Sequence, residues 1–414
     1  MATIRAFSAL RPRPDMAHMV AALPYDVLNV EEATKAAEDN PYSFLRVDKA
    51  EINLEGVDPY DERVYEAARD NLRWLIKNAM VWDEKPCLFI YRLEMDGRSQ
   101  AGLVACTSID EYLSGIIKKH ENTRVDKEND RIRHVEMTNA NTGPIFLAYR
   151  LEECPDIRDI MALWMYLHNE LFEFTTDDGI VHTVWKIDDP DVLMALFIGF
   201  TNVSSLYIAD GHHRQAAAVN VGLKRRKMYN EEDISEAEYN YTLSVIFPDN
   251  ELLIMDYNRF VSDLNGLTKE EFLESVGKIF EVKPVKYVPK PQTARTFGMY
   301  MTDQWYELKY SGEVEETDPV ASLDVSILQD KLLAPIMGIN DPRTDKRIDF
   351  IGGKRGLLEL ERRVNAEILG VAFAMFPTSM EQLMRIADAG LIMPPKSTWF
   401  EPKLLSGLFI HKFS

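Results

Sequence analysis

Five consecutive residues, Asp210-Gly211-His212-His213-Arg214, have side chains that can bind an anion or move a proton. A short apolar run precedes them and an alanine-rich segment follows them, which predicts a strand, a tight turn and a helix. The first turn of a helix attracts phosphate or carboxylate through its amide groups and dipole, and an arginine adds a fork of donors. The pattern therefore indicates an anion-binding centre. An ordinary turn glycine followed by surface or core histidines is the alternative interpretation, and the local pattern leaves both open.

A second polar stretch runs from His120 to His134 and reads HENTRVDKENDRIRH. It has many charges and no apolar stripe, which predicts a polar loop or a helix edge that faces a cleft. Within it, His120 and Glu121 place a base beside a carboxylate that can tune its pKa. For most of the other residues in this stretch, a solvated charged surface is the favoured interpretation.

Three more charged residues lie in segments of unusual composition. Asp26 follows Pro24 and is expected on a loop just before a helix. Residues 42–47 are predicted to form a strand that places Arg46 among apolar neighbours, where a charge needs an ion-pair partner or a ligand. Lys396 belongs to the proline-rich stretch from Met393 to Lys403, which we expect to be a rigid loop over a site or an interface, or else a structural strap.

The elements that must position these residues are a mixture of strands and helices. Strands are predicted at 88–95 and 100–107, joined in a hairpin by Asp96-Gly97-Arg98, and at 145–149, 180–187 and 206–208. Helices are predicted at 156–170 and 190–200, and a further hairpin joins 296–301 to 305–310. Because no regular alternation of strand and helix is present, the expected fold class is α+β.

Composition limits the class of protein. The composition, 46% hydrophobic and 28% charged, is typical of a globular protein, and the length of 414 residues predicts two or three domains or one elaborated domain. A net charge of −20 and the lack of a long basic stripe oppose binding to duplex nucleic acid, and we interpret the basic run 224–227 as a helix C-terminus. Three scattered cysteines, no signal-peptide pattern and no apolar stretch of membrane-spanning length predict a cytoplasmic protein.

Several phrases together resemble one family over nearly the whole chain, the bacterial and archaeal domain-of-unknown-function family 1015. They are PYDV at Pro24, NPYSFLRV at Asn40, the HENT…DR stretch at His120, ADGHHR at Ala209 and PPKSTWFEPK at Pro394. That family resembles the ParB/sulfiredoxin-like nucleotide-binding fold, whose phosphate loop opens a helix with a Gly-x-His-Arg pattern. The resemblance implies a mixed-sheet core of that kind at 1–262, an α+β insertion at 263–320, and a C-terminal helical segment and strap at 321–414.

One position narrows what the resemblance implies. Sulfiredoxin requires a cysteine where this chain has His212, which excludes its thiol chemistry, and the acidity opposes a ParB-type DNA-binding role. The remaining precedent is the free-serine kinase of the same fold. It implies a nucleotide-dependent phosphotransferase that acts on a small hydroxyl metabolite, with L-serine as the first candidate, ATP or ADP as donor and Mg²⁺ as metal. A nucleotide-binding regulatory switch and a metal-dependent hydrolase that uses the histidines are the alternatives.

The resemblance also implies roles for the candidate residues. The set that would hold the phosphates is Asp210, Gly211, His212, His213 and Arg214, and Asp210 would in addition bind the metal or set the geometry of the loop. Asp26, Glu121 and His213 are the candidate catalytic residues, and the two carboxylates compete as base or metal ligand. Arg46, His120 and Lys396 are expected to contact the substrate. The expected partners are a nucleotide and a small molecule, with no nucleic acid and no membrane; homo-oligomerisation stays open.

Overall fold

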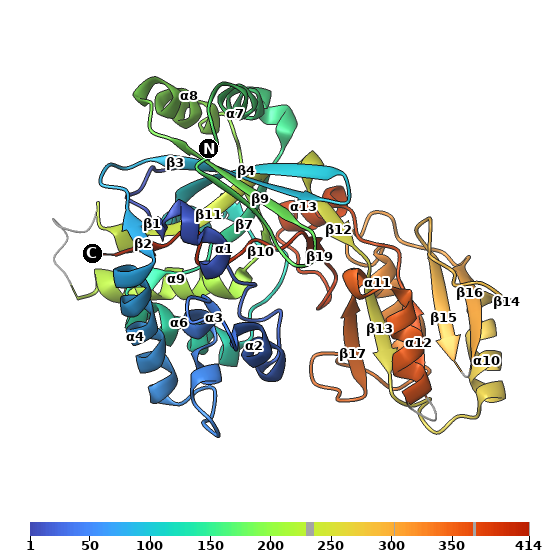
Figure 1. The fold of residues 1–414 in the computed structure, drawn as a ribbon. Helices are drawn as coiled ribbons and strands as arrows, with labels where there is room; N and C mark the ends of the chain where they lie inside the picture. Colours follow the sequence, from blue (N-terminus) through green and yellow to red (C-terminus); the bar gives the residue numbers. More distant parts are fainter. Residues whose placement is uncertain (229–235, 302, 367–369, 414) are drawn as a thin grey trace. The chain divides into compact units, whose positions relative to one another are not determined.

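The structure is a computed structural model, which describes residues 1–228, 236–301, 303–366 and 370–413. The chain forms two compact units (Figure 1). Unit 1 comprises residues 1–252 and 402–414, and unit 2 comprises residues 253–401. This division differs from the three predicted segments: the first boundary lies at 252 instead of 262, and residues 263–320 do not form a separate insertion. Strands from residues 263–320 belong to the same six-stranded sheet as strands from residues 348–374. This arrangement depends on pairing between strands that are far apart in the sequence.

Unit 1 is built on an eight-stranded mixed sheet with the strand order β5-β10-β7-β11-β4-β3-β9-β8. The strands of this sheet are β3 (Leu88–Met95), β4 (Arg98–Ser108), β5 (Ile117–Lys118), β7 (Ile145–Tyr149), β8 (Phe172–Thr175), β9 (Val181–Ile187), β10 (Leu206–Asp210) and β11 (Tyr241–Pro248). The predicted β3–β4 hairpin is confirmed. Asp96 and Gly97 both have positive φ, 51° and 77°, as a tight hairpin turn requires.

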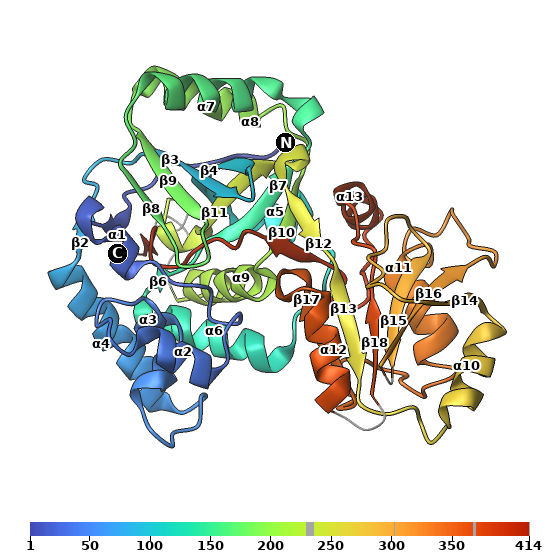
Figure 2. The ribbon, with the colours of Figure 1, turned by 45° about the vertical axis from the view of Figure 1, so that its right-hand side comes forward.

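Helices cover both faces of this sheet (Figures 1 and 2). On one face, α7 (Pro155–Leu167) and α8 (Pro190–Phe200) pack together and close an apolar core with Met161, Leu196 and Phe200. On the other face, α9 (His212–Arg226) lies against α6 (Val125–Thr138), which in turn contacts α4 (Glu62–Asn78). Helix α9 thus begins at the end of β10, against the sheet, as the strand–turn–helix pattern predicts.

The remaining elements of unit 1 are short. The helices are α1 (Ala17–Val20), α2 (Val30–Ala37), α3 (Leu45–Asp48) and α5 (Ile109–Leu113). Two strand pairs complete the unit: β1 (Leu10–Pro12) with β2 (Met80–Trp82), and β6 (Ala140–Asn141) with β20 (His411–Lys412). The strand expected at 42–47 is wrong, because residues 42–44 form a turn and residues 45–47 belong to α3. Its Arg46 side chain is held by carbonyl groups at the end of α2, and this tertiary contact overrides the apolar pattern.

Unit 2 contains an antiparallel sheet with the order β14-β16-β15-β18-β13-β17. Its strands are β13 (Tyr257–Val261), β14 (Phe280–Val285), β15 (Thr296–Met301), β16 (Gln304–Tyr310), β17 (Ile348–Gly352) and β18 (Val371–Ala374). The helices of unit 2 are α10 (Lys269–Gly277), α11 (Asp324–Leu328), α12 (Leu357–Ala366) and α13 (Met380–Asp388). The predicted β15–β16 hairpin is confirmed, and with both units the α+β class is confirmed.

The proline-rich C-terminal stretch is not wholly irregular. Its central residues form β19 (Trp399–Glu401), which pairs with β12 (Leu253–Met255). The expectation of a loop without regular structure is therefore wrong at these three residues, because the backbone partner lies far away in the sequence. The stretch also crosses from unit 2 to unit 1 at Pro402.

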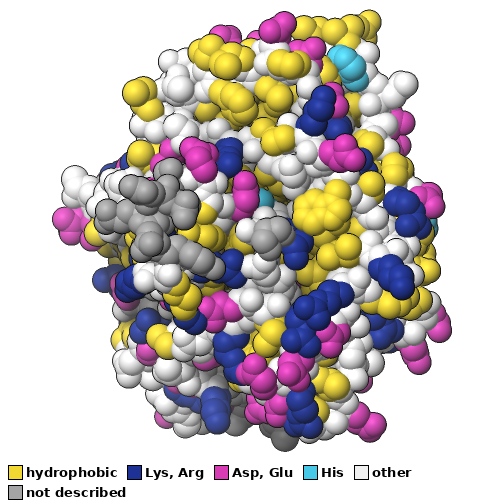
Figure 3. All heavy atoms as spheres, turned by 90° about the vertical axis from the view of Figure 1, so that its left-hand side faces the viewer, with side chains coloured by type: hydrophobic (Ala, Val, Ile, Leu, Met, Phe, Trp, Pro, Cys, Tyr) yellow, Lys and Arg dark blue, Asp and Glu magenta, His cyan; other side chains and the backbone are white. Residues whose placement is uncertain are grey.

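Charges of both signs are interspersed on the face shown in Figure 3. In the basic run at the end of α9, Lys224 forms an ion pair with Glu136 and Arg226 with Asp110. These pairs fit the interpretation of the run as a helix C-terminus. Among the described residues, no helix is both long enough and apolar enough to cross a membrane.

Candidate functional site

The turn between β10 and α9 depends on Gly211. This residue has φ 94° and ψ 26°, in the left-handed region, and is the N-cap of α9. A Cβ atom at this position would lie 3.2 Å from Nη2 and 3.3 Å from Nε of Arg214. Glycine is therefore required both by the backbone and by the Arg214 side chain, which folds back over the start of its own helix. Glycine has no side chain that could cap the helix, and the start of α9 has no side-chain cap hydrogen bond among the described residues.

Asp210 fixes this turn through both of its carboxylate oxygens. Oδ1 accepts a hydrogen bond from the Gly211 amide at 2.8 Å, and Oδ2 lies 3.0 Å from the Lys403 ammonium. Burial raises the pKa of Asp210, but Lys403 and Arg214 outweigh it and hold the pKa below its usual range. The carboxylate is thus ionised and engaged in holding the turn.

Arg214 lies where two further segments of unit 1 meet. Its Nη1 donates a hydrogen bond to the carbonyl oxygen of Pro144 at 2.6 Å. A Cβ atom on Gly143 would lie 3.0 Å from this Nη1 and 3.0 Å from Oγ of Ser406. The Ser406 hydroxyl is buried and has no hydrogen-bond partner among the described residues. A buried unsatisfied hydroxyl beside a guanidinium group is a feature that a bound anion would complete.

A polar cavity adjoins Arg214. Its polar lining includes Tyr25, Asp48, Arg131, His134, Thr142 and Arg214. Thr142 donates a hydrogen bond to Asp48 at 2.8 Å, and the Arg131 guanidinium lies 4.0 Å from the centre of the Tyr25 ring. Burial, together with the charge of the adjacent Asp26, raises the pKa of the Tyr25 hydroxyl. The phenol therefore stays protonated at neutral pH and is available as a hydrogen-bond donor in the cavity.

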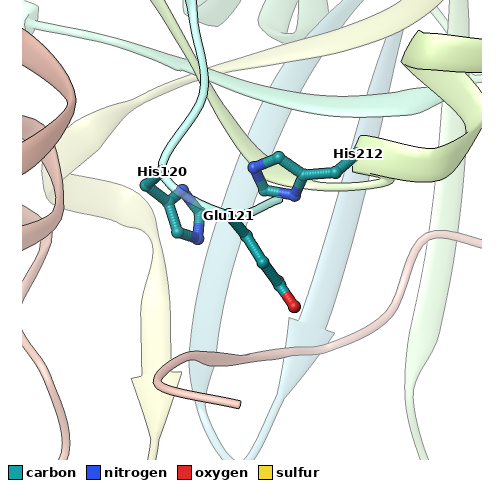
Figure 4. Close-up of side chains that lie close together, drawn as sticks. All are labelled: His120, Glu121 and His212. Carbon is teal, nitrogen blue, oxygen red and sulfur yellow. The ribbon is translucent and has the colours of Figure 1, made fainter. Parts of the chain in front are cut away.

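A cluster of His120, Glu121 and His212 forms the other side of the turn (Figure 4). One potential ligand atom from each side chain lies within 4.8 Å of the other two. The two imidazole rings are perpendicular, with centroids 4.5 Å apart. Strand pairing explains the proximity: β5 runs parallel to β10, so both strands end at the same edge of the sheet and deliver the two histidines there.

Both histidines of this cluster are neutral at pH 7. Burial lowers the pKa of His120 to about 4, although a hydrogen bond with the Ile208 backbone and the charge of Asp210 act in the opposite direction. Burial, followed by the neighbouring His120, also lowers the pKa of His212 well below its ordinary value. The Nε2 atom of His212 is buried and has no hydrogen-bond partner among the described residues. The unprotonated nitrogen of a neutral imidazole can accept a hydrogen bond or bind a metal ion.

The structure thus brings together six of the predicted site residues, namely His120, Glu121, Asp210, Gly211, His212 and Arg214. Two others lie at the margin. His213 accepts a hydrogen bond from the Arg124 amide at 3.0 Å. Asp26 is exposed and follows Tyr25, which lines the cavity.

Arg46 and Lys396 lie elsewhere. The Arg46 guanidinium donates to the carbonyl oxygens of Asn40 and Ala37 and to Asn53, which is a structural arrangement. Lys396 belongs to unit 2, where its ammonium lies 5.7 Å from the centre of the Tyr257 ring and its carbonyl accepts from Arg259.

Sequence reasoning missed four residues around the turn: Tyr25, Thr142, Lys403 and Ser406. Lys403 could have been identified from the sequence, because it is the last residue of the same PPKSTWFEPK phrase that contains Lys396. Ser406 had no comparable signal. Its backbone pairs with Ala22, which connects the C-terminal segment to the chain just before Tyr25.

Together, the fold and the site define an α+β protein with a candidate anion site where a helix begins at the edge of a mixed sheet. The chain belongs to the family described as "Protein of unknown function (DUF1015)", whose model matches residues 4–326. No curated protein matches the chain.

Solved structures with low similarity include a mutant of a free serine kinase in complex with ADP, at 17% identity and a TM-score of 0.35, covering 72% of this chain and 87% of that one. SbnI with a C-terminal truncation from Staphylococcus aureus matches at 11% identity and a TM-score of 0.38, covering 73% and 85%. A conserved hypothetical protein from Pyrococcus furiosus matches at 16% identity and a TM-score of 0.35, covering 74% and 94%. These TM-scores are too low to support any conclusion about activity, so the activity has to be inferred from the site.

Proposed function

We propose that this protein is a nucleotide-dependent phosphotransferase that moves a phosphoryl group from ATP or ADP to the hydroxyl group of a small metabolite, with L-serine as the first candidate. The observation that carries the proposal is the arrangement around Gly211. The start of α9 and the Arg214 guanidinium lie in one small region of unit 1 with the Ser406 hydroxyl, which has no hydrogen-bond partner among the described residues, and with the Lys403 ammonium, which pairs with Asp210. Such a set of donors and positive charges is suited to a phosphate group.

In this proposal the protein acts mainly by positioning and by electrostatic stabilisation, as phosphoryl transfer requires. The amide groups of His212 and His213 and the Arg214 side chain hold the transferring phosphate. The cavity beside Arg214, with Tyr25, Thr142 and Asp48, has a volume of about 20 Å³, which is room for one water molecule, so the acceptor binds outside it. Asp26 or Glu121 accepts the hydroxyl proton.

The residues of the turn fit only in part the Mg²⁺ that the resemblance implies. Both oxygens of Asp210 are already engaged by Gly211 and Lys403, so the Asp210 carboxylate does not fit the role of a metal ligand in this arrangement. Mg²⁺ commonly enters such sites with the nucleotide phosphates and needs only one or two carboxylates from the protein. The exposed carboxylate of Asp26 fits that requirement.

The test is a transfer assay with the full-length protein. The protein is incubated with ATP or ADP, Mg²⁺ and a panel of hydroxyl metabolites that includes L-serine, and phosphorylated products are detected by mass spectrometry. We expect one acceptor to be phosphorylated with a matching loss of donor. Binding of the nucleotide without product for any acceptor would contradict transfer and favour a nucleotide-sensing switch.

Arg214→Ala tests the assignment of the phosphate site. We expect this variant to fold normally and to lose nucleotide affinity by at least tenfold, since a charge-assisted hydrogen bond contributes about 1.5–3 kcal/mol. Arg63→Ala is the matched control, because Arg63 is an exposed arginine in α4 that forms an ion pair with Asp61, away from the turn. Equal nucleotide affinity in the two variants would remove Arg214 from the site.

We also propose a cytoplasmic location. Cys87, Cys106 and Cys154 are unpaired and buried, which fits a reducing compartment. Cell fractionation with detection of the chain by an antibody is the corresponding measurement. Recovery of the chain outside the cytoplasmic fraction would contradict this location.

A further inference from the structure

We propose that His120, Glu121 and His212 bind one divalent transition-metal ion of the Zn²⁺ class. This site is distinct from the Mg²⁺ that would accompany a nucleotide, and the proposal does not rest on the transfer activity. Three features of the cluster carry it: the donor set, its geometry and an unsatisfied ligand atom.

The donor set selects the class of metal. Two imidazoles and one carboxylate are the ligands of catalytic zinc sites with His₂Glu coordination and of 2-His-1-carboxylate sites for other transition metals. Mg²⁺ and Ca²⁺ prefer oxygen ligands, so two histidines oppose them. Both histidines are almost fully buried, at 1% and 7% exposure, which keeps competing water away from the rings.

The geometry needs only a small adjustment. Metal–ligand bonds of about 2.0–2.1 Å in a tetrahedral site place the ligand atoms about 3.4 Å from one another. In the structure the three candidate ligand atoms all lie within 4.8 Å of one another. Side-chain rotations that move each atom by roughly 1 Å or less would therefore complete the site, and the backbone can stay where the ends of β5 and β10 place it.

The unsatisfied atom is Nε2 of His212, which is buried and has no hydrogen-bond partner among the described residues. Leaving such a group unpaired in the interior is unfavourable, and a bound metal ion would remove this penalty. His120 contributes the supporting feature of a metal ligand, because its ring is held by a hydrogen bond with the Ile208 backbone. Ring nitrogens of metal-binding histidines commonly make such a bond to a carbonyl group, which fixes the orientation of the ring.

Three protein ligands leave at least one coordination position for water or substrate, as in catalytic sites. The assignment also decides between the two candidate bases. If Glu121 is a metal ligand, Asp26 is the remaining candidate for the proton acceptor, and the Mg²⁺ of the proposed transfer would then be held by the nucleotide phosphates and not by Asp26. The metal lies on the same turn as Arg214, since His212 and Arg214 are separated by a single residue of α9.

The experiment uses the full-length protein, treated with a chelator and dialysed, and titrated with Co²⁺ alone and then with Zn²⁺ alone. Co²⁺ reports the coordination through its visible absorption bands, and Zn²⁺ should displace it. We expect saturation at one equivalent. Glu121→Gln and His212→Asn should each weaken Co²⁺ binding by at least tenfold, since even changes around metal ligands commonly cost about 10–100-fold in affinity.

His168→Ala is the matched control, because His168 is an exposed histidine that stacks on Trp164 in the same unit. Its Co²⁺ affinity should equal that of the wild type. If His212→Asn fails to fold, Glu121→Gln still decides, because it keeps the size and the backbone of a half-buried residue. Lack of a saturable Co²⁺ spectrum, or equal affinity in Glu121→Gln and wild type, would overturn the proposal.

One further variant separates this proposal from the phosphotransferase proposal. Arg214→Ala should weaken nucleotide binding by at least tenfold and leave Co²⁺ binding unchanged, whereas Glu121→Gln should weaken Co²⁺ binding in the absence of any nucleotide. Metal binding without nucleotide binding would therefore refute only the transfer activity, and nucleotide binding without metal binding would refute only this site.

Discussion

Replacing Gly211 with alanine is the most direct test of how the turn works. The backbone at Gly211 lies at φ 94°, where an L-residue other than glycine is strained by about 1–2 kcal/mol. The new methyl group would also lie 3.2–3.4 Å from the Arg214 guanidinium atoms. Because this separation is tighter than ordinary contact, the guanidinium has to move by a few tenths of an ångström, and its 2.6 Å hydrogen bond to Pro144 is disturbed.

Two magnitudes follow from this geometry. The free energy of unfolding should fall by about 1–2 kcal/mol, which is the backbone term. The affinity for ADP should fall by at least tenfold, because a loss of about 1.4 kcal/mol in the interaction with Arg214 corresponds to a factor of ten. Urea unfolding followed by circular dichroism measures the first quantity, and isothermal titration calorimetry with ADP measures the second.

Gly179→Ala is the matched control. Gly179 has a similar φ of 80°, but a Cβ atom there would meet nothing within 4 Å. It should show the same loss of stability with unchanged ADP affinity. If Gly211→Ala and Gly179→Ala bind ADP equally well, the contact between Gly211 and Arg214 has no part in binding, and the reasoning is refuted.

Three other changes test separate parts of the structure. Burial raises the pKa of Asp324 to about 6, above its value in the unfolded chain, so the folded state holds the proton more tightly. The free energy of unfolding should therefore fall by about 3 kcal/mol in total as the pH rises from about 4 to 6. Asp324→Asn should remove this part of the pH dependence of thermal unfolding, and an unchanged profile would contradict it. Lys403→Met removes the ion-pair partner of the partly buried Asp210 carboxylate. The pKa of Asp210, which lies below its usual range in the wild type, should rise toward the ordinary value in an NMR titration, and the free energy of unfolding in urea should fall by about 1–3 kcal/mol. No change in either quantity would mean that the ion pair contributes nothing. Ser406→Ala should leave stability within about 0.5 kcal/mol, since its hydroxyl has no partner among the described residues, but lower ADP affinity in calorimetry; a large loss of stability would show that the hydroxyl is already satisfied.

Local sequence features predicted several elements correctly because their causes are local. Asp96-Gly97 can adopt the positive φ values of a tight hairpin turn, and the strands on each side follow from it. Asp189-Pro190 caps and starts α8, which spans the predicted residues 190–200. Gly211 at the end of an apolar strand likewise predicts the turn that opens α9. In each case the backbone conformation depends on residues within a few positions of one another.

Contacts between distant segments were beyond this reasoning. Residues 42–47 look like a strand, yet 42–44 form a turn and 45–47 belong to α3, where the side chain of Arg46 is held by the end of α2. The division into two units followed strand pairing across long stretches of chain and therefore differed from the predicted segments. Apolar patterns report which residues are buried but do not identify the partner against which they pack.

For the candidate site, the sequence by itself determined the chemical groups and the local turn. These are a glycine that permits the left-handed turn, an arginine one helical turn after it, and two histidines and a carboxylate that each follow a short strand. Only the tertiary structure decided which of them meet. The parallel pairing of β5 with β10 brings His120 and Glu121 to His212, and Lys403 reaches Asp210 across 193 positions of sequence. The physical reason is that a turn is set by the dihedral preferences of neighbouring residues, whereas an ion pair or a metal cluster depends on which strands pair and which surfaces pack.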